Sequence, residues 1–282
     1  MLVSGALRSQ RLFFARHVRG FSHTQRVSTF KVGNPPQSHW RVGDGAAPLP
    51  SHVSDKIRTI EVKDAVPRDL YQILGSAIVP RPIAFVSTLS ADGVPNLAPF
   101  SYFSMIGHNP PMVSISCSLT TRRPKDTREN ILATKEFSVN IVSEHLAVPM
   151  NATSVECPAD VDEWEIAGLK KRPSVGIKPA LVDASLVNFE CELYHHLDIA
   201  PPSETGQANL PPTTTLILGL IQRVHVNEGI LTPDGSAIDP AKLQAVARLG
   251  GTAYAKVNEG FELARPVWKE MRKEMEAKRV QD

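Results

Sequence analysis

The sequence has few cysteines and no long hydrophobic run, and these absences exclude several classes of protein. Its three cysteines, Cys117, Cys157 and Cys191, are odd in number and widely spaced among 282 residues. They form no C-x-x-C pair, so we expect neither a disulfide framework nor a zinc site. The apolar runs, such as the one around Leu216–Leu218, are much shorter than the ~20 residues needed to cross a bilayer. We therefore expect no membrane span and no metal site.

Several nucleotide-binding and catalytic motifs are also missing. The chain has no G-x-G-x-x-G after an expected strand, no Walker-type phosphate loop, and neither H-E-x-x-H nor G-x-S-x-G. His195 and His196 are adjacent, and on a strand they would point to opposite faces and could not share one metal ion. The usual glycine-rich phosphate loops are therefore excluded as a means of binding a nucleotide.

Basic charge is concentrated at the N-terminus. The first 43 residues hold seven of the 31 basic residues and no acidic residue. The remaining chain then has 24 basic against 29 acidic residues, a net charge of −5. Binding to nucleic acid through charge requires a net basic surface, so we expect no nucleic acid partner.

Residues 1–30 have the composition of a mitochondrial presequence. They are rich in Arg and Ser and free of acids, and Leu7, Leu12, Phe14 and Val18 could share one helical face. The segment Val18–Ser22 places an arginine two residues before an aromatic residue, which resembles a matrix-protease cleavage pattern. The alternative is a disordered basic tail on a cytoplasmic protein. Residues 31–65, which contain four prolines, predict a flexible lead-in that precedes the folded domain.

Short β-rich segments dominate the rest of the chain. Ile83–Leu89 and Pro95–Phe103 flank the turn Ala91-Asp92-Gly93 and predict a hairpin. Further strands are expected at Met112–Ser118, Glu136–Val142, Ala184–Leu197 and Thr213–Val226. Short strands without regular βα alternation predict a mainly β fold, an antiparallel barrel with a few helices.

Three helices and one surface loop complete this prediction. Helical patterns cover Asp126–Thr134, Pro240–Leu249 and Pro266–Arg279, and the last of these forms a charged C-terminal helix within residues 263–282. Ala200–Pro212 contains four prolines and predicts a surface loop inserted between two long strands.

Polar residues gather at the ends of the first predicted strands. Ser87 and Thr88 end one strand, and Pro99 interrupts the next, which is typical of an edge strand with free main-chain groups. Arg123, Lys125 and Thr127 lie at a predicted helix start, where a cation, a hydroxyl and free N–H groups could bind a phosphate. Alternatively, Lys125 is a solvated lysine and Thr127 an ordinary helix cap.

Four motifs in one order along the chain resemble the flavin-reductase-like family of FMN-binding split-barrel proteins. They are Val79–Ala84, Asn96–Phe103, Lys125–Thr127 with Asn130 and Ile131, and Arg248–Gly251 with Tyr254. The resemblance implies a Greek-key antiparallel split barrel over residues 66–262. It also implies a homodimer that binds FMN at or near the subunit interface.

The resemblance also assigns candidate roles to individual residues. The FMN phosphate would contact Lys125, Asp126, Thr127 and the hydroxyls of Ser87 and Thr88. The flavin ring would lie against Asn96, Ala98, Pro99 and Ser101. Arg248, Gly250 and Gly251 would place positive charge or N–H groups near the reduced flavin, and Tyr254 would stack, cover the ring or simply pack. His225 is either a catalytic residue near the flavin or a structural strand histidine.

The expected chemistry is that of the cofactor, with the protein supplying binding and orientation. FMN would accept hydride from NADH or NADPH and pass electrons to free flavin, oxygen or a small organic acceptor. The alternatives are an FMN-dependent oxygenase or oxidase of a small organic substrate, and a non-catalytic flavin-binding protein.

The presequence prediction can be tested with a reporter. A fusion of residues 1–30 to a fluorescent protein should accumulate in mitochondria, because acid-free, arginine-rich amphipathic segments are import signals. Replacing its five arginines by glutamine provides the matched control and should abolish import. A cytosolic signal from the unmodified fusion would contradict the prediction.

Overall fold

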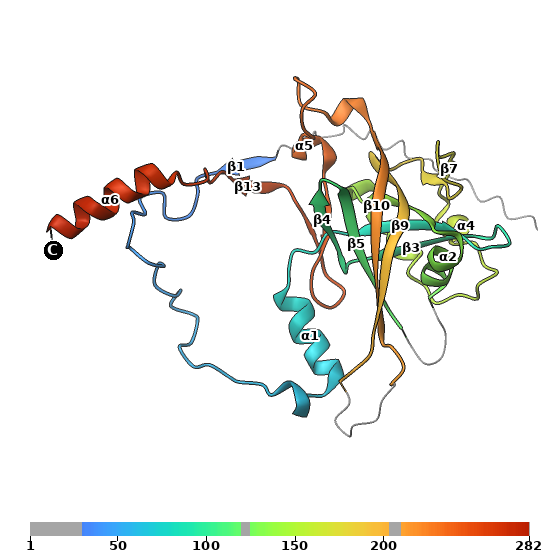
Figure 1. Ribbon diagram of the computed structural model, residues 1–282, viewed down its shortest axis with the longest axis horizontal. Helices are drawn as coiled ribbons and strands as arrows, with labels where there is room; N and C mark the ends of the chain where they lie inside the picture. Colours follow the sequence, from blue (N-terminus) through green and yellow to red (C-terminus); the bar gives the residue numbers. More distant parts are fainter. Residues whose placement is uncertain (1–29, 120–124, 203–209, 282) are drawn as a thin grey trace, which may run out of the picture.

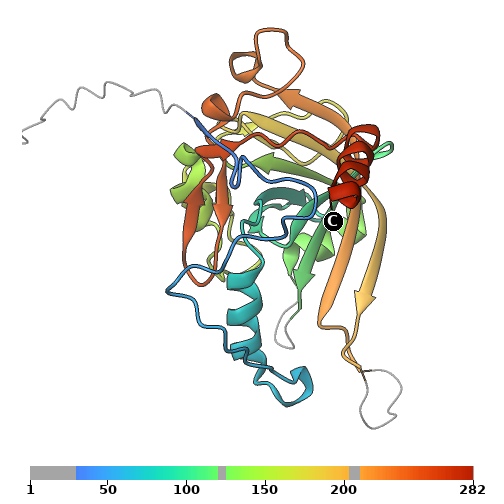
Figure 2. The same cartoon turned by 90° about the vertical axis from the view of Figure 1, so that its left-hand side faces the viewer.

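A seven-stranded sheet forms the body of the protein (Figure 1). The computed structural model describes residues 30–119, 125–202 and 210–281, so most of the predicted presequence lies outside it. The order in the sheet is β3 (Pro95–Phe100), β2 (Ala84–Leu89), β6 (Glu136–Ile141), β9 (Val187–Ile199), β10 (Thr214–Val226), β5 (Pro111–Ser118) and β4 (Phe103–His108). All neighbours are antiparallel. The long strands β9 and β10 curve along one side of the barrel (Figure 2). The prediction of a mainly β, antiparallel barrel is confirmed.

Smaller elements surround this sheet. Three two-stranded pairs join β1 (Lys31–Gly33) to β13 (Glu259–Phe261), β7 (Lys171–Arg172) to β8 (Leu181–Val182), and β11 (Val246–Arg248) to β12 (Tyr254–Lys256). The α-helices are α1 (Pro67–Ala77), α2 (Asp126–Thr134), α3 (Ala147–Ala152), α4 (Glu163–Ala167), α5 (Pro240–Leu243) and α6 (Trp268–Gln281). The 3-10 turns are η1 (Val62–Asp64), η2 (Glu144–Leu146) and η3 (Glu228–Ile230). Across the described ranges, no helix is long and apolar enough to span a bilayer.

Strand β2 is buried on both faces, which explains its continuous apolar run. Ala84 and Val86 point into the barrel interior and join Val113, Ile115 and Phe137 in one apolar cluster. Phe85 points to the opposite face, where the second cluster includes Leu97 of β3, Leu146, Met150 of α3 and Trp164 of α4. Side chains alternate between the two faces of a strand, so one short segment contributes to both cores. The helices after β6 therefore cover the outer face of β2 and β3.

A glycine in β10 makes room for the largest side chain of the barrel interior. A Cβ atom at Gly219 would overlap the ring of Phe137, which is fully buried. The strand pairing between β9 and β10 also shifts register beside Gly219. Cys117 is fully buried in the same cluster, and burial raises the pKa of its thiol to about 12. Cys117 is therefore a core residue of the barrel.

Two predicted element boundaries are wrong for local reasons. The predicted helix Pro240–Leu249 stops at Leu243, because Gln244 adopts a left-handed conformation and the chain continues as β11. The predicted strand Pro95–Phe103 ends at Phe100, and β4 starts at Phe103 after a bend at Ser101 and Tyr102. The other predicted strands and the helix at Asp126–Thr134 are present, the helix with the predicted bounds.

A buried carboxylate fixes the loop after β7 to the long strands. Glu190 of β9 has no exposed surface, and its two oxygens accept hydrogen bonds from the backbone N–H groups of Val175 (2.6 Å) and Gly176 (2.8 Å). His225 Nε2 lies 2.8 Å from the same carboxylate, and Arg223 Nη1 lies 3.5 Å from it. Burial alone would raise the pKa of Glu190. The hydrogen bonds from Val175, His225 and Gly176 outweigh that effect, so the pKa is lowered.

This lowered pKa predicts a pH-dependent contribution to stability. A carboxylate with a folded-state pKa below its unfolded value stabilises the fold above the unfolded value, near 4.5 here, and loses that contribution as the pH falls through the folded value. Glu190→Gln should lower the free energy of unfolding at pH 7 by about 1–3 kcal/mol, because a buried charge-assisted acceptor is lost. It should also flatten the decline of stability in acid, as measured by urea unfolding at several pH values.

Glu192→Gln is the matched control for this measurement. Glu192 lies two residues away on the same strand but is exposed, and it accepts one hydrogen bond from Gln222. The control should keep the acid dependence of the parent protein. The same acid dependence in Glu190→Gln and the parent would contradict the assignment.

Candidate functional site

A large cavity lies between the outer edge of the sheet, the N-terminus of α2 and the segment around α3 and α4. Its volume is about 750 Å³, within the range of cavities that hold small molecules and cofactors. Most of the lining comes from three segments: β3 with the bend that follows it, the start of α2, and residues 153–157 with Glu163. Seven of the predicted site residues line it, namely Asn96, Ala98, Pro99, Ser101, Lys125, Asp126 and Thr127.

The outer edge of β3 forms one wall of this cavity. β3 is the terminal strand of the sheet, as the proline inside it predicted. Pro95 and Pro99 have no N–H to present at the outer edge, and residues two apart on a strand turn their main-chain groups to the same side. Leu97, between these prolines, donates its N–H to Oε2 of Glu163 at 3.1 Å instead of to another strand. The main-chain carbonyls on this side of β3 therefore face away from β2 and are acceptors at the edge.

A buried network of amides and hydroxyls holds β2, β3 and α2 together behind the cavity. Asn96 Nδ2 donates to Thr127 Oγ1 at 2.9 Å and to Thr88 Oγ1 at 3.2 Å. Asn130 of α2 donates to the same Thr88 oxygen at 3.0 Å. All four side chains are buried. Because buried polar groups must be hydrogen-bonded, this network fixes Asn96 and Thr127, the two members that reach the cavity.

The start of α2 brings positive charge to the cavity. Lys125 is the N-cap residue and is exposed, and its side chain does not cap the helix. The first N–H groups of an α-helix have no partner within the helix and favour an anion. Arg123, the other cation predicted here, lies outside the described residues. Lys125 and the helix start therefore give this end of the cavity the character of an anion site.

Arg128, the arginine of α2, fixes the helix to the long strands and does not line the cavity. Arg128 donates to both carboxylate oxygens of Asp198 on β9, at 3.0 and 3.1 Å, and to Thr215 Oγ1 on β10 at 2.6 Å. Burial alone would lower the pKa of Arg128, but the bonds to Asp198 and Glu129 raise it. Hydrogen bonds from Thr215 and Arg128 in turn lower the pKa of Asp198. The ion pair therefore holds the start of α2 in place.

Alternating serines of β5 also reach the cavity. In the segment V-S-I-S-C-S, Val113, Ile115 and Cys117 point into the barrel core, while Ser116 and Ser118 line the cavity. Our sequence analysis missed these serines, although the two-residue alternation of β5 could have indicated them.

The segment around α4 contributes acidic residues that the sequence analysis also missed. Glu163 is buried at the start of α4, where its carboxylate accepts the N–H of Leu97 and a weak bond from Cys157 Sγ at 3.5 Å. Glu156 lines the same side. The side chain of Asp162 caps α4 by accepting from Trp164 N at 2.9 Å. Asp162 before α4 and Gly168 after it, which adopts a left-handed conformation, were the sequence signals for this helix. The cavity thus has Lys125, Asp126 and the helix N-terminus at the start of α2, and the carboxylates of Glu156 and Glu163 in the segment around α4.

Some predicted site residues lie away from the cavity lining. Ser87 and Thr88 are fully buried, and Thr88 supports the wall through Asn96. His225 contacts Glu190, as described above, and neither residue lines the cavity. Their roles as ligand contacts stay predictions.

Arg248, Gly250, Gly251 and Tyr254 belong to the hairpin of β11 and β12, which Arg81 connects to the cavity wall. Arg81 donates to the carbonyls of Gly75 at 2.5 Å and Leu249 at 2.9 Å, and its Nε lies 3.4 Å from Ser101 Oγ. The guanidinium of Arg248 covers the Tyr254 ring at 4.5 Å. Gly250 does allow a close backbone approach, but the group it approaches is Ser76 of α1.

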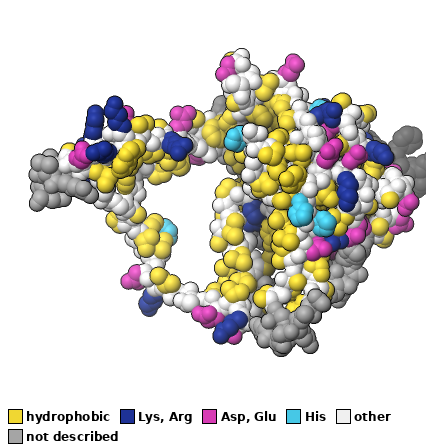
Figure 3. Space-filling view, in the orientation of Figure 1, with side chains coloured by type: hydrophobic (Ala, Val, Ile, Leu, Met, Phe, Trp, Pro, Cys, Tyr) yellow, Lys and Arg dark blue, Asp and Glu magenta, His cyan; other side chains and the backbone are white. Residues whose placement is uncertain are grey.

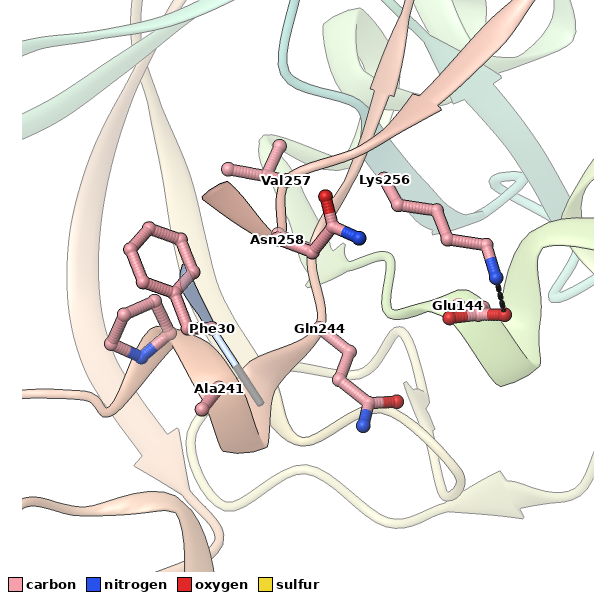
Figure 4. A pocket seen from close by; sticks show the side chains of 9 residues that line it. Phe30, Glu144, Ala241, Gln244, Lys256, Val257 and Asn258 are labelled. Atoms are coloured by element: carbon pink, nitrogen blue, oxygen red, sulfur yellow. Dashed lines mark hydrogen bonds and ion pairs between the residues drawn. The ribbon is translucent and has the colours of Figure 1, made fainter. Parts of the chain in front are cut away.

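A second, much smaller pocket lies beside Phe30, α5 and Val257 (Figure 4). Its volume is about 10 Å³, which leaves room for no more than one water molecule. An ion pair between Lys256 and Glu144 lies at its side. This pocket is too small to be the functional site.

Comparison with known proteins identifies the family. The family model described as a flavin reductase like domain matches residues 75–238, more than half of the chain. The chain belongs to the flavin-reductase-like family. The uncharacterized protein YwrF of Bacillus subtilis is 33% identical over 199 residues, covering 71% of this chain and 94% of the relative. An uncharacterized protein of Aquifex aeolicus is 36% identical over 196 residues, covering 69% and 93%.

Solved structures of the flavin-reductase-like type are similar to this chain in fold. Nitrilotriacetate monooxygenase component B from Bacillus cereus has a TM-score of 0.69 at 32% identity, over 74% of this chain and all of its own. The 2-nitrobenzoate 2-nitroreductase NbaA of Pseudomonas fluorescens has a TM-score of 0.65 at 26% identity, over 75% and 98%. A split-barrel protein of Shewanella frigidimarina, with a TM-score of 0.60 at 24% identity over 73% and 95%, supports the same fold. The family resemblance and the split-barrel fold are confirmed.

Proposed function

We propose that this chain binds FMN in the 750 Å³ cavity and acts as an oxidoreductase of the flavin reductase type. In this proposal, hydride passes from NADH or NADPH to the flavin, and electrons pass on to free flavin, oxygen or a small organic acceptor. The observation that carries the proposal is the cavity itself, which combines an anion site, a wall of main-chain acceptors and hydroxyl groups within a flavin-reductase-like fold.

The chemistry of the cavity walls suits the three parts of FMN. Lys125 and Thr127 at the start of α2 would hold the phosphate dianion. Ser116 and Ser118 supply hydroxyls for the polar ribityl chain, and the outer edge of β3 supplies main-chain groups for the edge of the ring. FMN, when bound, supplies the hydride acceptor, whereas the side chains of this protein bind and orient it.

The ion pair of Arg128 with Asp198 has a supporting role in this proposal. It restrains the start of α2, and it thereby keeps Lys125 and Thr127 on the cavity side of the helix. A phosphate site built on a restrained helix start loses less conformational freedom when the ligand binds. The position of the anion site therefore depends both on α2 and on the strand to which Arg128 binds.

A second candidate function is direct action on a small organic substrate. The 26% identical NbaA is a 2-nitrobenzoate 2-nitroreductase, which favours a reductive reaction with a small organic acceptor. An FMN-dependent oxygenase or oxidase is the related alternative. A non-catalytic flavin-binding protein is a third candidate. Reduction of the bound flavin by NADH or NADPH separates this candidate from the enzymes. We also propose that the protein is a homodimer, as in the family resemblance.

The phosphate assignment predicts selective loss of FMN binding. Lys125→Ala should weaken FMN binding about tenfold to hundredfold, because a charge-assisted bond contributes about 1.5–3 kcal/mol. Binding of riboflavin, which has no phosphate, should change little when both ligands are measured by fluorescence quenching. Lys135→Ala removes the exposed lysine that follows the C-terminal end of α2 and should affect neither ligand. Equal losses for FMN and riboflavin would refute the phosphate site.

The oxidoreductase assignment predicts reduction of the bound flavin by a nicotinamide nucleotide. The purified protein, loaded with FMN under anaerobic conditions, should lose its visible flavin absorbance when NADH or NADPH is added, and the preferred nucleotide should act faster. Free FMN with the same nucleotide is the control for the uncatalysed reaction. A protein that binds FMN but keeps its absorbance with both nucleotides would favour the binding-protein alternative. Failure to bind FMN would exclude both the oxidoreductase and the non-catalytic flavin-binding protein.

A further inference from the structure

The guanidinium of Arg81 lies where three segments that are far apart in the sequence meet. Its Nη1 donates to the carbonyls of Gly75 (2.5 Å) and Ile78 (2.7 Å), and its Nη2 donates to the carbonyl of Leu249 (2.9 Å). Gly75 is in the last turn of α1, where carbonyls have no partner within the helix and a cation is favoured. Leu249 follows β11 directly. Arg81 therefore fixes both α1 and the hairpin of β11 and β12 to the chain just before β2.

These bonds are important for α1 because little else holds that helix in place. No residue of α1 is buried. Figure 3 shows open space between the barrel, with α1 against it, and the extended segment of residues 34–66. Tyr71 of α1 lines the large cavity. Arg81 therefore helps to place one wall of the candidate site.

Arg81 has no acidic partner among the residues that the structure describes. Its side chain is half-buried, and its three shortest bonds end on neutral main-chain carbonyls. Two other arginines differ in this respect, since Arg128 is paired with Asp198 and Arg223 lies beside the buried carboxylate of Glu190. A cation that is bonded only to dipoles keeps its full positive charge. Its field therefore acts on any group that occupies the space beside it.

The large cavity lies beside Arg81, with Ser101 between them. Ser101 lines the cavity, and its Oγ accepts a long hydrogen bond from Arg81 Nε at 3.4 Å. A hydroxyl that accepts a bond from a guanidinium has its own proton free to donate in another direction. A ligand atom that accepts this proton would lie about 6 Å from Arg81 Nε, the sum of this contact and one further hydrogen bond. Ser101 is thus prepared to donate to a negative group in the cavity.

Arg248, the arginine that the sequence favoured for a place near the flavin, is occupied elsewhere. Its guanidinium covers the ring of Tyr254 at 4.5 Å and donates to the carbonyl of Gly251. The hydroxyl of Tyr254 in turn donates to Asn151 Oδ1 at 2.9 Å. None of these four residues lines the large cavity. The cation beside the β3 side of the cavity is therefore Arg81.

We propose that Arg81 is a positioning residue for the flavin ring, which fixes Ser101 as a hydrogen-bond donor and stabilises the negative charge of the reduced ring. This inference rests on the proposed binding of FMN, with the edge of its ring at the outer edge of β3. The oxidised ring is neutral, whereas the reduced ring carries negative charge at N1. A fixed cation beside the ring therefore increases the affinity for the reduced form more than the affinity for the oxidised form.

The test compares the affinity of each variant for oxidised FMN with its affinity for reduced FMN, because the ratio of the two sets the reduction potential of the bound flavin. Arg81→Gln should lose roughly tenfold more affinity for reduced than for oxidised FMN, the effect of one charge that acts over about 6 Å near a protein surface. The bound flavin should then be harder to reduce in an anaerobic titration against a reference dye. Arg81→Lys keeps the charge and should restore the ratio. A purely structural role would weaken both forms equally and leave the ratio unchanged.

Ser101→Ala tests the path from Arg81 to the cavity without disturbing the three carbonyl bonds. It should change the ratio in the same direction as Arg81→Gln but by a smaller factor. In the Arg81→Gln background it should add little, because two residues that act through one contact are not additive. Since this variant leaves the support of α1 intact, it tests the inference even where Arg81→Gln does not fold.

Arg68→Gln is the matched control. Arg68 is an exposed arginine in the first turn of α1, so its loss changes the net charge in the same way. This variant should keep the affinity ratio of the parent. An unchanged ratio in Ser101→Ala and in any folded Arg81→Gln would overturn the inference while FMN binding stands, and so would a larger change in Arg248→Gln. A parent protein that binds neither form of FMN would refute the proposed function itself.

Discussion

The candidate site depends on how the outer edge of β3 is satisfied. A terminal strand presents main-chain groups that would otherwise pair with a further strand. Two prolines remove N–H groups from β3, and Glu163 accepts the N–H of Leu97. The carbonyls at this edge therefore stay available, while the Glu163 carboxylate occupies the N–H group with which a further strand would pair. Because Glu163 comes from α4, the same bond fixes the segment around α4 to the sheet.

The cavity is polar in an asymmetric way, and this asymmetry constrains the orientation of any ligand. Lys125 and the first N–H groups of α2 supply positive charge beside Asp126, whereas Glu156 and Glu163 come from the segment around α4. A ligand with one anionic end would place that end at α2, since the carboxylates would repel it. The serines of β5 supply neutral hydrogen-bonding groups in the same cavity. FMN has one anionic end, a polyhydroxyl chain and a ring with both donors and acceptors. These groups are complementary to the charged and hydrogen-bonding groups that line the cavity.

The sequence predicted residues that line the cavity better than it predicted the surrounding helices, and the reasons are local. Pro99 correctly indicated an edge strand, and the α2 segment had clear bounds. The prediction of a helix through Leu249 failed because Gln244, a residue without a special backbone preference, adopts a left-handed conformation, in which its carbonyl accepts the N–H of Glu144. α1 was missed because its start has Pro67 but no polar capping side chain. Glu163 could not be found from spacing, since its partner Leu97 is 66 residues away.

α1 connects the family domain with the part of the chain outside it. At its C-terminal end, Arg81 binds the carbonyls of Gly75 and Ile78, and Ser76 packs against Gly250 of the hairpin. Tyr71 lines the cavity from the same helix, yet no residue of α1 is buried. A helix held mainly at one end, with its apolar side in water, has little packing energy of its own. Its position, and with it one wall of the cavity, must therefore depend on whatever covers that apolar side.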